Sequence, residues 1–269
     1  MRLRRRNMAD LADRHYLYQE SVQDTQSEID FVEETWAELR DRPAELLRED
    51  FCGTANTACE WVRRDRAHRA VGIDLDDEVL EWGELNNIAQ LDADQQARIE
   101  LLQEDVVETL PEPADIVLAM NFSYFLFNTR AAMLDYFRNV REGLVEDGLF
   151  FLDAYGGYDA PREIEEEREC DGFTYVWEQA SFNPIDSMME CRIHYQFPDG
   201  SRIDNAFTYR WRLWTLPELR ELLGEAGFGQ VTVYWEGTDQ EKNEGNGIYQ
   251  PAEVGDADPG WVCYIVAQR

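Results

Sequence analysis

The chain has 269 residues, of which 25 are lysine or arginine and 56 are aspartate or glutamate, so its formal net charge is −31. Such an acidic chain repels phosphate backbones and anionic lipids, which excludes the usual nucleic-acid and membrane partners. No apolar run approaches the roughly 18 residues of a membrane span, and five cysteines without a CxxC pair predict a reducing, cytoplasmic setting with no disulfide framework and no metal site.

The first part of the chain predicts helix, and regular alternation follows it. Apolar residues recur at helical spacing over residues 9–41, and Pro43 ends that region. The elements expected after it are a strand at Leu46–Phe51, a helix at Thr57–Arg66, a strand at Ala70–Asp74, a helix at Asp77–Ala89, strands at Ile99–Gln103 and Ala114–Phe122, a helix at Thr129–Leu144 and a strand at Leu149–Tyr155. Strands that alternate with helices in this way predict a parallel sheet covered by helices on both faces.

The pattern changes after Tyr155. The polar stretch "DAPREIEEEREC" is expected to be helical or irregular, and three runs rich in aromatic and β-branched residues follow it: "FTYVWEQASF", "SMMECRIHYQF" and "IDNAFTYRWRLW". The turn sequences "NPID" and "PDGS" separate these runs, so they predict an antiparallel meander. A helix comes next, with a capping box at Thr215 and Glu218, Pro217 in its first turn and Gly227 at its C-cap. The runs "VTVYWEG" and "WVCYIVAQ" then predict two closing strands.

Glycine or acidic residues follow the predicted strands, at the edge where open α/β sheets bind ligands. The first strand leads into "EDFCGTA", where Gly53 is the only glycine. A turn that cradles pyrophosphate uses several glycines, and the bulky Phe51 disfavours such an approach. A nucleoside without phosphates needs less room than a pyrophosphate, and Gly53 with the small Ala55 leaves enough room for it. Taken alone, a turn with one glycine is more often an ordinary turn.

The next two strand ends carry acids. Asp74 lies about twenty residues after Gly53, where a carboxylate can accept hydrogen bonds from both ribose hydroxyls. Asp105 suits an adenine amino group, with the amide of Val106 facing the ring. The segment "AMNFSY" ends the fourth strand and would lie beside the reactive group. Each acid alone could be a helix cap, but their order and spacing favour a nucleoside site.

These motifs together resemble those of the class I S-adenosylmethionine-dependent methyltransferases of the small-molecule type. "EDFCGTA" is similar to the first motif but departs from it at Phe51 and Ala55; "AVGIDLDDEVLEWG", "EDV" and "GLVEDGLFFLDAYGG" are similar to later motifs, and the last two strands to the reversed hairpin. The resemblance implies an α/β fold: a doubly wound, mostly parallel, seven-stranded Rossmann-like sheet from residues 1–155 and 215–269, with an antiparallel β lid inserted at 156–214.

The resemblance also implies a cofactor and a reaction. S-adenosylmethionine would be bound by Tyr18, Glu49, Phe51, Cys52, Gly53, Thr54, Asp74, Leu75, Asp105, Val106 and Asn121. The expected reaction is N- or O-methylation of a small-molecule acceptor, an in-line displacement that depends on positioning. The candidate catalytic residues are Asp153, as base or amine anchor, with Tyr155, Asn121 and Tyr124.

The lid leaves alternatives open. Its aromatic residues either form a cage for a cationic or ring-shaped acceptor or simply pack the sheet. Arg210 and Arg212 alternate with Tyr209 and Trp211, so inward-facing arginines would indicate an anionic acceptor, and His194 could face the site or a core hydrogen bond. Two other functions remain: a non-catalytic protein that binds S-adenosylmethionine, or a methyltransferase that acts on a protein. We expect a monomer or homodimer.

Overall fold

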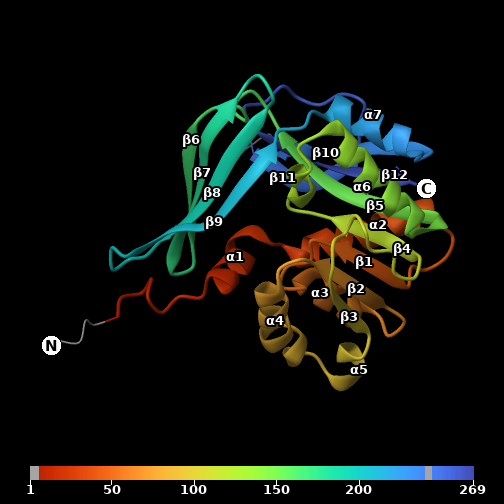
Figure 1. Ribbon diagram of the computed structural model, residues 1–269, viewed down its shortest axis with the longest axis horizontal. Helices are drawn as coiled ribbons and strands as arrows, with labels where there is room; N and C mark the ends of the chain where they lie inside the picture. Colours follow the sequence, from red (N-terminus) through yellow and green to blue (C-terminus); the bar gives the residue numbers. More distant parts are fainter. Residues whose placement is uncertain (1–5, 240–243) are drawn as a thin grey trace.

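The computed structural model describes residues 6–239 and 244–269 and contains two separate sheets. The larger sheet has eight strands in the order β11-β10-β12-β5-β4-β1-β2-β3, and the smaller has four in the order β6-β7-β8-β9. In Figure 1 the smaller sheet stands to one side of the larger one, with α1 beneath it. We call the smaller sheet the lid.

The strands of the larger sheet are β1 (Leu46–Asp50), β2 (Arg69–Asp74), β3 (Ile99–Gln103), β4 (Ala114–Ala119), β5 (Leu144–Gly156), β10 (Gln230–Asp239), β11 (Glu244–Pro251) and β12 (Trp261–Gln268). The first five pair with one another in parallel, whereas β12 is antiparallel to β5 and β10. The chain runs from β1 out to β3 and then returns to β4 beside β1. Ligands of such sheets bind at this reversal, beyond the carboxyl ends of the strands.

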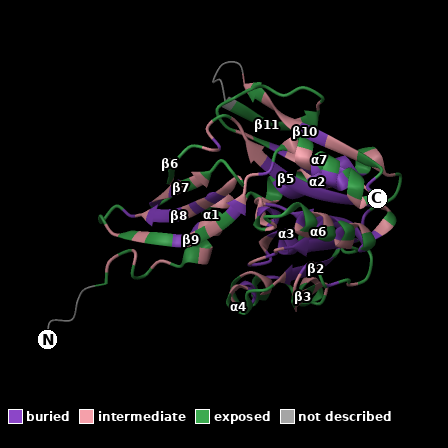
Figure 2. Ribbon diagram, turned by 45° about the horizontal axis from the view of Figure 1, so that its top comes forward, coloured by how far each residue is buried: buried purple, intermediate pink, exposed green. Residues whose placement is uncertain are grey.

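The helices are α1 (Arg14–Val22), α2 (Thr25–Leu39), α3 (Asn56–Arg64), α4 (Asp77–Asn86), α5 (Ala93–Gln96), α6 (Arg130–Glu142) and α7 (Leu216–Ala226), with short 3-10 turns η1 (Ile88–Gln90) and η2 (Ser123–Leu126). Two hydrophobic cores form on the two faces of the larger sheet, one with α2 and α3 and the other with α6 and α7. Figure 2 accordingly shows the central strands as buried. The predicted arrangement of helices on both faces is confirmed.

The lid strands are β6 (Ile164–Cys170), β7 (Phe173–Asn183), β8 (Met188–Gln196) and β9 (Arg202–Arg212). All three pairings are antiparallel, as predicted for the meander. A third core joins the lid to α1, where Leu17 packs with Ile193 and Tyr195. The N-terminal helix is therefore fastened to the lid by apolar contacts.

Several predicted boundaries were wrong for identifiable reasons. The stretch predicted to be helical or irregular contains β6, whose charged residues suit an exposed edge strand paired with β7. The larger sheet has eight strands rather than seven, because the glycine-rich β11 pairs with the edge of β10. The fourth strand stops at Ala119 instead of Phe122, since Asn121 and Phe122 both have positive φ.

The signals predicted at the two ends of α7 are confirmed. Thr215 and Glu218 form the predicted capping box at α7, with a proline in its first turn. Gly227 ends that helix with φ of 100°, a conformation that favours glycine. Asp76 caps α4 through the amides of Glu78 and Val79.

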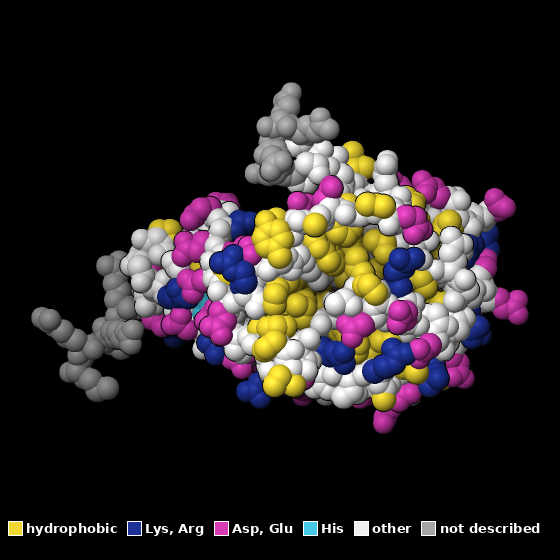
Figure 3. Space-filling view, turned by 90° about the horizontal axis from the view of Figure 1, so that it is seen from above, with side chains coloured by type: hydrophobic (Ala, Val, Ile, Leu, Met, Phe, Trp, Pro, Cys, Tyr) yellow, Lys and Arg dark blue, Asp and Glu magenta, His cyan; other side chains and the backbone are white. Residues whose placement is uncertain are grey.

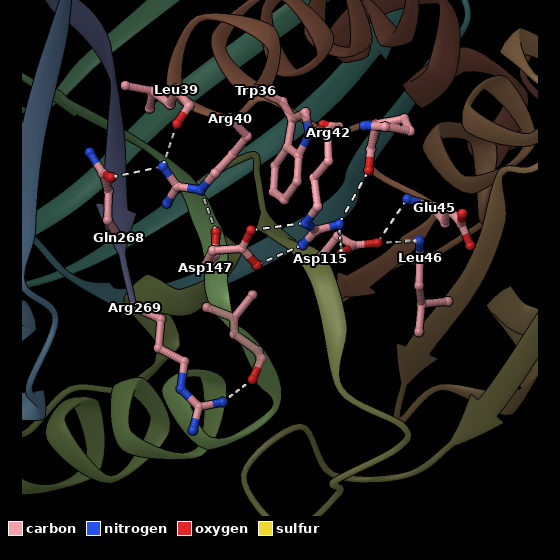
Figure 4. A network of polar contacts seen from close by, with 12 residues as sticks. Trp36, Leu39, Arg40, Arg42, Glu45, Leu46, Asp115, Asp147, Gln268 and Arg269 are labelled. Carbon is pink, nitrogen blue, oxygen red and sulfur yellow. Dashed lines mark hydrogen bonds and ion pairs between the residues drawn. The ribbon is translucent and has the colours of Figure 1, made fainter.

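A network of ion pairs ties together the amino ends of the central strands (Figure 4). Arg42 forms two hydrogen bonds with the carboxylate of Asp147, at 2.7 and 2.9 Å, and an ion pair of 2.7 Å with Asp115. The other oxygen of Asp115 accepts the amides of Glu45 and Leu46 at 2.7 and 2.9 Å. Each of the two acids at this edge of the sheet therefore has an arginine partner.

No helix in the part of the chain that the structure describes has the length and hydrophobicity needed to cross a membrane.

Candidate functional site

The turn after β1 keeps a glycine-like backbone although it holds one glycine. The angle φ is 58° at Phe51, 52° at Gly53 and 55° at Ala55. Only glycine adopts this left-handed conformation freely, and other residues lose roughly 1–2 kcal/mol in it. No heavy atom lies within 4 Å of the place where a Cβ would project from Gly53. The turn therefore presents open backbone at this position.

Neighbouring elements hold this turn in place. The ring of Phe51 packs toward α6, with its centroid 5.7 Å from that of Tyr136. A Cβ on Gly83 of α4 would come within 2.5 Å of the carbonyl oxygen of Thr54, so this close approach requires glycine. Gln19 of α1 donates to the hydroxyl of Thr54 at 2.6 Å. The N-terminal helix thus lies directly over the turn, and the bulky ring of Phe51 packs in the apolar core.

Asp74 ends β2 and binds the turn from the side. Its two oxygens accept the amides of Gly53 at 2.9 Å and Asp76 at 3.0 Å, and burial raises its pKa. The neighbouring Leu75 leaves 66% of its surface exposed. An acid and an exposed apolar side chain therefore stand together beside the glycine.

The residues predicted after β3 lie at the adjacent strand end. Asp105 accepts the amide of Val107 at 2.9 Å, while Val106 is buried and its carbonyl accepts Nη2 of Arg48 at 3.1 Å. Cys52 is also buried, and burial raises the pKa of its thiol. Asp105 thus lies just beyond the end of β3, the strand that pairs with β2 and its Asp74, while Val106 and Cys52 are part of the packing.

Two further acids are buried behind the turn. Glu49 of β1 accepts the amide of Ala58 at 3.0 Å, and burial raises its pKa to about 8. Glu28 of α2 lies nearby, and burial together with the charges of Asp153 and Glu49 raises its pKa well above the ordinary value. The hydroxyl of Thr57 lies within hydrogen-bond reach of both glutamates. Among the described residues, Oε2 of Glu28 has no partner.

The described residues give none of these acids a cationic partner. The groups that act on Glu28, Glu49, Asp74 and Asp153 are amides, hydroxyls and other acids. Buried carboxylates in folded proteins are normally paired, because an isolated charge away from water is costly. The arrangement at the carboxyl ends of β1, β2 and β5 therefore favours a positively charged ligand.

Asp153, predicted as the base, holds a turn. Its carboxylate accepts the amides of Asn121 at 2.8 Å and Phe122 at 2.9 Å, both of which have positive φ. Burial raises the pKa of Asp153 to about 7, against the lowering effect of these two amides. Tyr124 is fully buried and donates to the carbonyl of Asp153 at 2.6 Å. Both side chains thus brace the turn that presents Asn121 and Phe122.

A cavity of about 450 Å³ opens between the lid and the ends of β4 and β5. Asn121 and Tyr155 line it, whereas Asp153 and Tyr124 do not. The hydroxyl of Tyr155 lies 2.9 Å from the sulfur of Met189, and burial raises its pKa well above the usual range. Several of the other lining residues are aromatic and include Tyr18, Trp177, Tyr209, Trp211 and Trp261. On the face shown in Figure 3, hydrophobic side chains gather at the middle of the molecule with charged ones around them.

The two faces of the lid differ in character. The alternation in β9 turns Tyr209 and Trp211 toward the cavity, while the side chain of Arg210 is 80% exposed. Arg212 pairs with Glu218 at 2.7 Å. Neither arginine lines the cavity. Inward-facing arginines would have indicated an anionic acceptor, so the arrangement gives no support for one.

His194 lies on the outer face of the lid. It is buried, its Nε2 is 3.0 Å from Glu178, and its Nδ1 accepts the amide of Asn205 at 3.0 Å. These bonds fix the ring in a structural role away from the cavity.

Sequence reasoning missed several acidic residues of the site, among them Glu28, Glu166 and Glu236. Glu28 occupies a position on the apolar stripe of α2, four residues before Val32, and an acid on a buried stripe is a signal that could have been read. Glu166 and Glu236 line the cavity from β6 and β10. Nothing in their local sequence distinguishes them from the many other acids of this chain.

No protein-family model and no curated protein sequence matches this chain. Solved structures do match. An S-adenosylmethionine-dependent methyltransferase from Clostridium acetobutylicum has a TM-score of 0.69 at 16% identity, and the match covers 94% of this chain and 96% of that one. For an amino pentose methyltransferase from Micromonospora echinaspora, solved with bound S-adenosylmethionine, the TM-score is 0.66 at 14% identity, with 95% of each chain covered.

A sugar N-methyltransferase from a Streptoalloteichus species gives a TM-score of 0.63 at 18% identity, covering 96% of this chain and 93% of that one. At these identities the likeness is one of fold. The chain shares the α/β sheet and the antiparallel lid of S-adenosylmethionine-dependent methyltransferases, and the predicted fold class is confirmed.

Proposed function

We propose that this chain, which has the fold of S-adenosylmethionine-dependent methyltransferases, methylates a small-molecule acceptor on nitrogen or oxygen. One observation carries the proposal: the carboxyl edge of the sheet gathers Glu28, Glu49, Asp74 and Asp153 around an open glycine turn without a cationic partner. A pyrophosphate would be repelled there. S-adenosylmethionine bears a sulfonium and an ammonium group beside one carboxylate, so its positive charges suit this edge.

The residues present fit such a ligand. We assign Asp74 to the ribose hydroxyls, and Leu75, Asp105 and Val106 to the adenine. Glu49, with Glu28 behind it, would receive the ammonium group, and Asn121 would lie near the methyl group. When bound, S-adenosylmethionine supplies an electrophilic methyl group, and the chain supplies position and exclusion of water.

The cavity under the lid supports a small acceptor. Its volume of about 450 Å³ lies in the range of small-molecule sites, and it is bounded on one side by Tyr155 and on the other by the lid. We therefore propose that residues 156–214 form a lid inserted between the two parts of a cofactor-binding domain, 1–155 and 215–269. The compared proteins from Micromonospora and Streptoalloteichus are named for amino pentose and sugar N-methylation, which supports an acceptor of similar size.

The chain's own side chains have distinct parts in this proposal. Tyr155 lines the cavity, and because burial keeps it protonated it does not act as a base. Asp153 positions Asn121 and Phe122 through their amides, and Tyr124 positions Asp153. The acceptor's lone pair forms the new bond to carbon, the carbon–sulfur bond breaks with its electrons left on sulfur, and the acceptor loses a proton.

The setting proposed is the cytoplasm. All five cysteines are free, which fits a reducing compartment.

The test is a calorimetric titration with S-adenosylmethionine. We expect micromolar binding by the wild-type protein and at least a tenfold weaker affinity for Asp74→Ala, whereas Asp77→Ala, an exposed acid at the start of α4, should bind normally. Equal affinity in Asp74→Ala, or no binding by folded wild-type protein, would overturn the assignment. Formation of S-adenosylhomocysteine in an acceptor screen would then separate an enzyme from a protein that only binds.

A further inference from the structure

The charge and composition of the acceptor cavity narrow the class of acceptor. Among the described residues that line it, the titratable groups are tyrosines and the acids Asp159, Glu166 and Glu236; none is lysine, arginine or histidine. We propose that the acceptor is a small organic dication, an inference that rests on the proposed function. The amine to be methylated would lie in the aromatic part of this cavity, the inner chamber, and a second ammonium group would lie at its acidic edge, the rim.

The inner chamber is built for a cation. The alternating residues of β7 and β9 turn their rings to one face, where the centroids of Tyr209 and Trp211 lie 4.5 Å apart and that of Trp177 lies 6.2 Å from Trp211. Tyr209 and Trp211 are stacked on one another, and with Trp177 they form a wall rich in aromatic rings, the kind of surface to which alkylammonium ions bind. Tyr155 and Trp261 close the opposite wall. A chamber of this kind takes an amine with a short carbon chain.

A second hollow, of about 780 Å³, continues from the chamber and is acidic. The two share Glu166, Glu236 and Trp261, and the outer hollow adds Asp256 and Asp258. A group that extends from the aromatic chamber into the second hollow therefore comes near these two glutamates and two exposed aspartates. A second ammonium group on the acceptor would lie here, still protonated, while the first reacts.

The nearest arginines do not neutralise this rim. Arg162 pairs with Asp159 at 2.7 Å, so Asp159 contributes little net charge. Arg168 lies over the ring of Tyr175, 5.2 Å from its centroid, and does not line either hollow. Glu166 has no ion-pair partner among the described residues, and an oxygen of Glu236 accepts the amide of Gly247 at 2.8 Å. The negative charge at the rim thus comes from Glu166 and Glu236 together with the two aspartates.

The chemistry of methyl transfer fits a reacting amine in the chamber and a second, unreactive ammonium group at the rim. The reacting amine enters as a cation and must lose its proton before its lone pair can form the bond to the methyl carbon, and burial away from water favours this loss because desolvation lowers the pKa of an amine. The carbon–sulfur electron pair stays on sulfur, and the proton released by the nitrogen passes toward the rim and solvent. The distal ammonium takes no part in bonding and fixes the register of the acceptor.

The experiment compares three probes of similar length by calorimetry: 1,4-diaminobutane, 4-amino-1-butanol and 1,4-butanediol, each with and without S-adenosylhomocysteine. We expect affinity to fall about tenfold for each charge that is removed. The double variant Glu166→Gln/Glu236→Gln should lose at least tenfold in diamine affinity and keep its affinity for S-adenosylhomocysteine, which reports that it is folded. Glu167→Gln, one residue away on the other face of β6, is the matched control and should behave as wild type.

The outcomes separate the two proposals. If 1,4-butanediol binds as tightly as 1,4-diaminobutane, the proposal of a cationic acceptor is wrong. If 4-amino-1-butanol binds as tightly as 1,4-diaminobutane, the proposal of a second ammonium site is wrong. Tight binding of S-adenosylhomocysteine without diamine binding would overturn this inference and leave the proposed methyltransferase standing. Diamine binding without cofactor binding would support the cation site and overturn the methyltransferase.

Discussion

Two pairs of acids, one at each edge of the larger sheet, have opposite surroundings. At the amino ends of the strands, Asp115 and Asp147 share Arg42, and this arginine is the main cause that lowers the pKa of Asp147 (Figure 4). At the carboxyl ends, Glu49 and Asp153 are buried without an arginine, and burial raises their pKa values to about 8 and about 7.

The difference separates a supporting edge from a binding edge. Arg42, in the loop after α2, joins β4 and β5 through Asp115 and Asp147, so the charges of these two acids are balanced within the protein. Unpaired acids at the carboxyl ends cost stability in the free protein, a cost that a cationic ligand can offset on binding. Four predictions test this comparison, from the largest expected effect to the smallest.

The largest effect is expected from Glu49→Gln. Removing one partner of a buried charge pair costs ~2–5 kcal/mol, so the dissociation constant for S-adenosylmethionine should rise roughly thirtyfold or more. Calorimetry measures it, with Glu45→Gln as the control, because Glu45 is an exposed acid just before the same strand. The binding-edge assignment fails if Glu49→Gln binds within threefold of wild type.

The pH dependence of stability should also distinguish the two edges. A raised pKa means that folded Glu49 keeps its proton between about 4.5 and about 8, where the unfolded chain has lost it, so rising pH favours unfolding over this window. The midpoint of thermal unfolding of the free protein should therefore fall as the pH rises through this window. The raised pKa of Asp153, about 7, contributes a fall of the same sign.

High salt reduces the general repulsion of an acidic chain, so the scan belongs in concentrated salt. Glu49→Gln should flatten the curve relative to Glu45→Gln. A midpoint that rises with pH in wild type would contradict the assignment of buried, unpaired acids.

At the supporting edge, Arg42→Ala should reduce the free energy of unfolding by about 1–2 kcal/mol, since it leaves the largely buried Asp115 without its ion pair. Its affinity for S-adenosylmethionine should not change. Urea unfolding measures the loss against Arg138→Ala, an exposed pair with Asp135 that should matter little. A large loss of cofactor affinity in Arg42→Ala would contradict the claim that the amino edge takes no part in binding.

The smallest effect is expected within the turn itself. Ala55→Gly removes the strain of a left-handed backbone at Ala55 but adds conformational freedom to the unfolded chain. The free energy of unfolding should therefore change by less than about 1 kcal/mol. Cofactor affinity should stay within threefold of wild type. Ala58→Gly, three residues later inside α3, should destabilise by about 1 kcal/mol or more. Equal losses in the two variants would show that Ala55 is not strained.

Much of the fold was predictable because it depends on local pattern. The alternation of apolar strands and amphipathic helices indicated the sheet, and the capping box at Thr215 set the start of α7. The edge strands β6 and β11 were not predictable, since their polar sequences become strands only by pairing with β7 and β10.

The site was predictable where residues follow strand ends in order. Gly53 and Asp74 meet through a hydrogen bond, as their spacing suggested. Roles that depend on three-dimensional packing were not: Tyr124 and Asp153 brace a turn, and Glu28 comes from a helix whose place against the sheet cannot be read from spacing. The departure at Phe51 changes the side chain while the backbone stays glycine-like.

The most direct measurement is a pair of titrations of the free wild-type protein near neutral pH, one with S-adenosylmethionine and one with NAD, whose pyrophosphate carries the opposite charge. The account predicts micromolar binding of S-adenosylmethionine, with protons released as Glu49 ionises, and no detectable binding of NAD. Binding of NAD with equal or greater affinity, or failure of the folded protein to bind S-adenosylmethionine, would contradict the claim that the unpaired acids serve a cationic nucleoside.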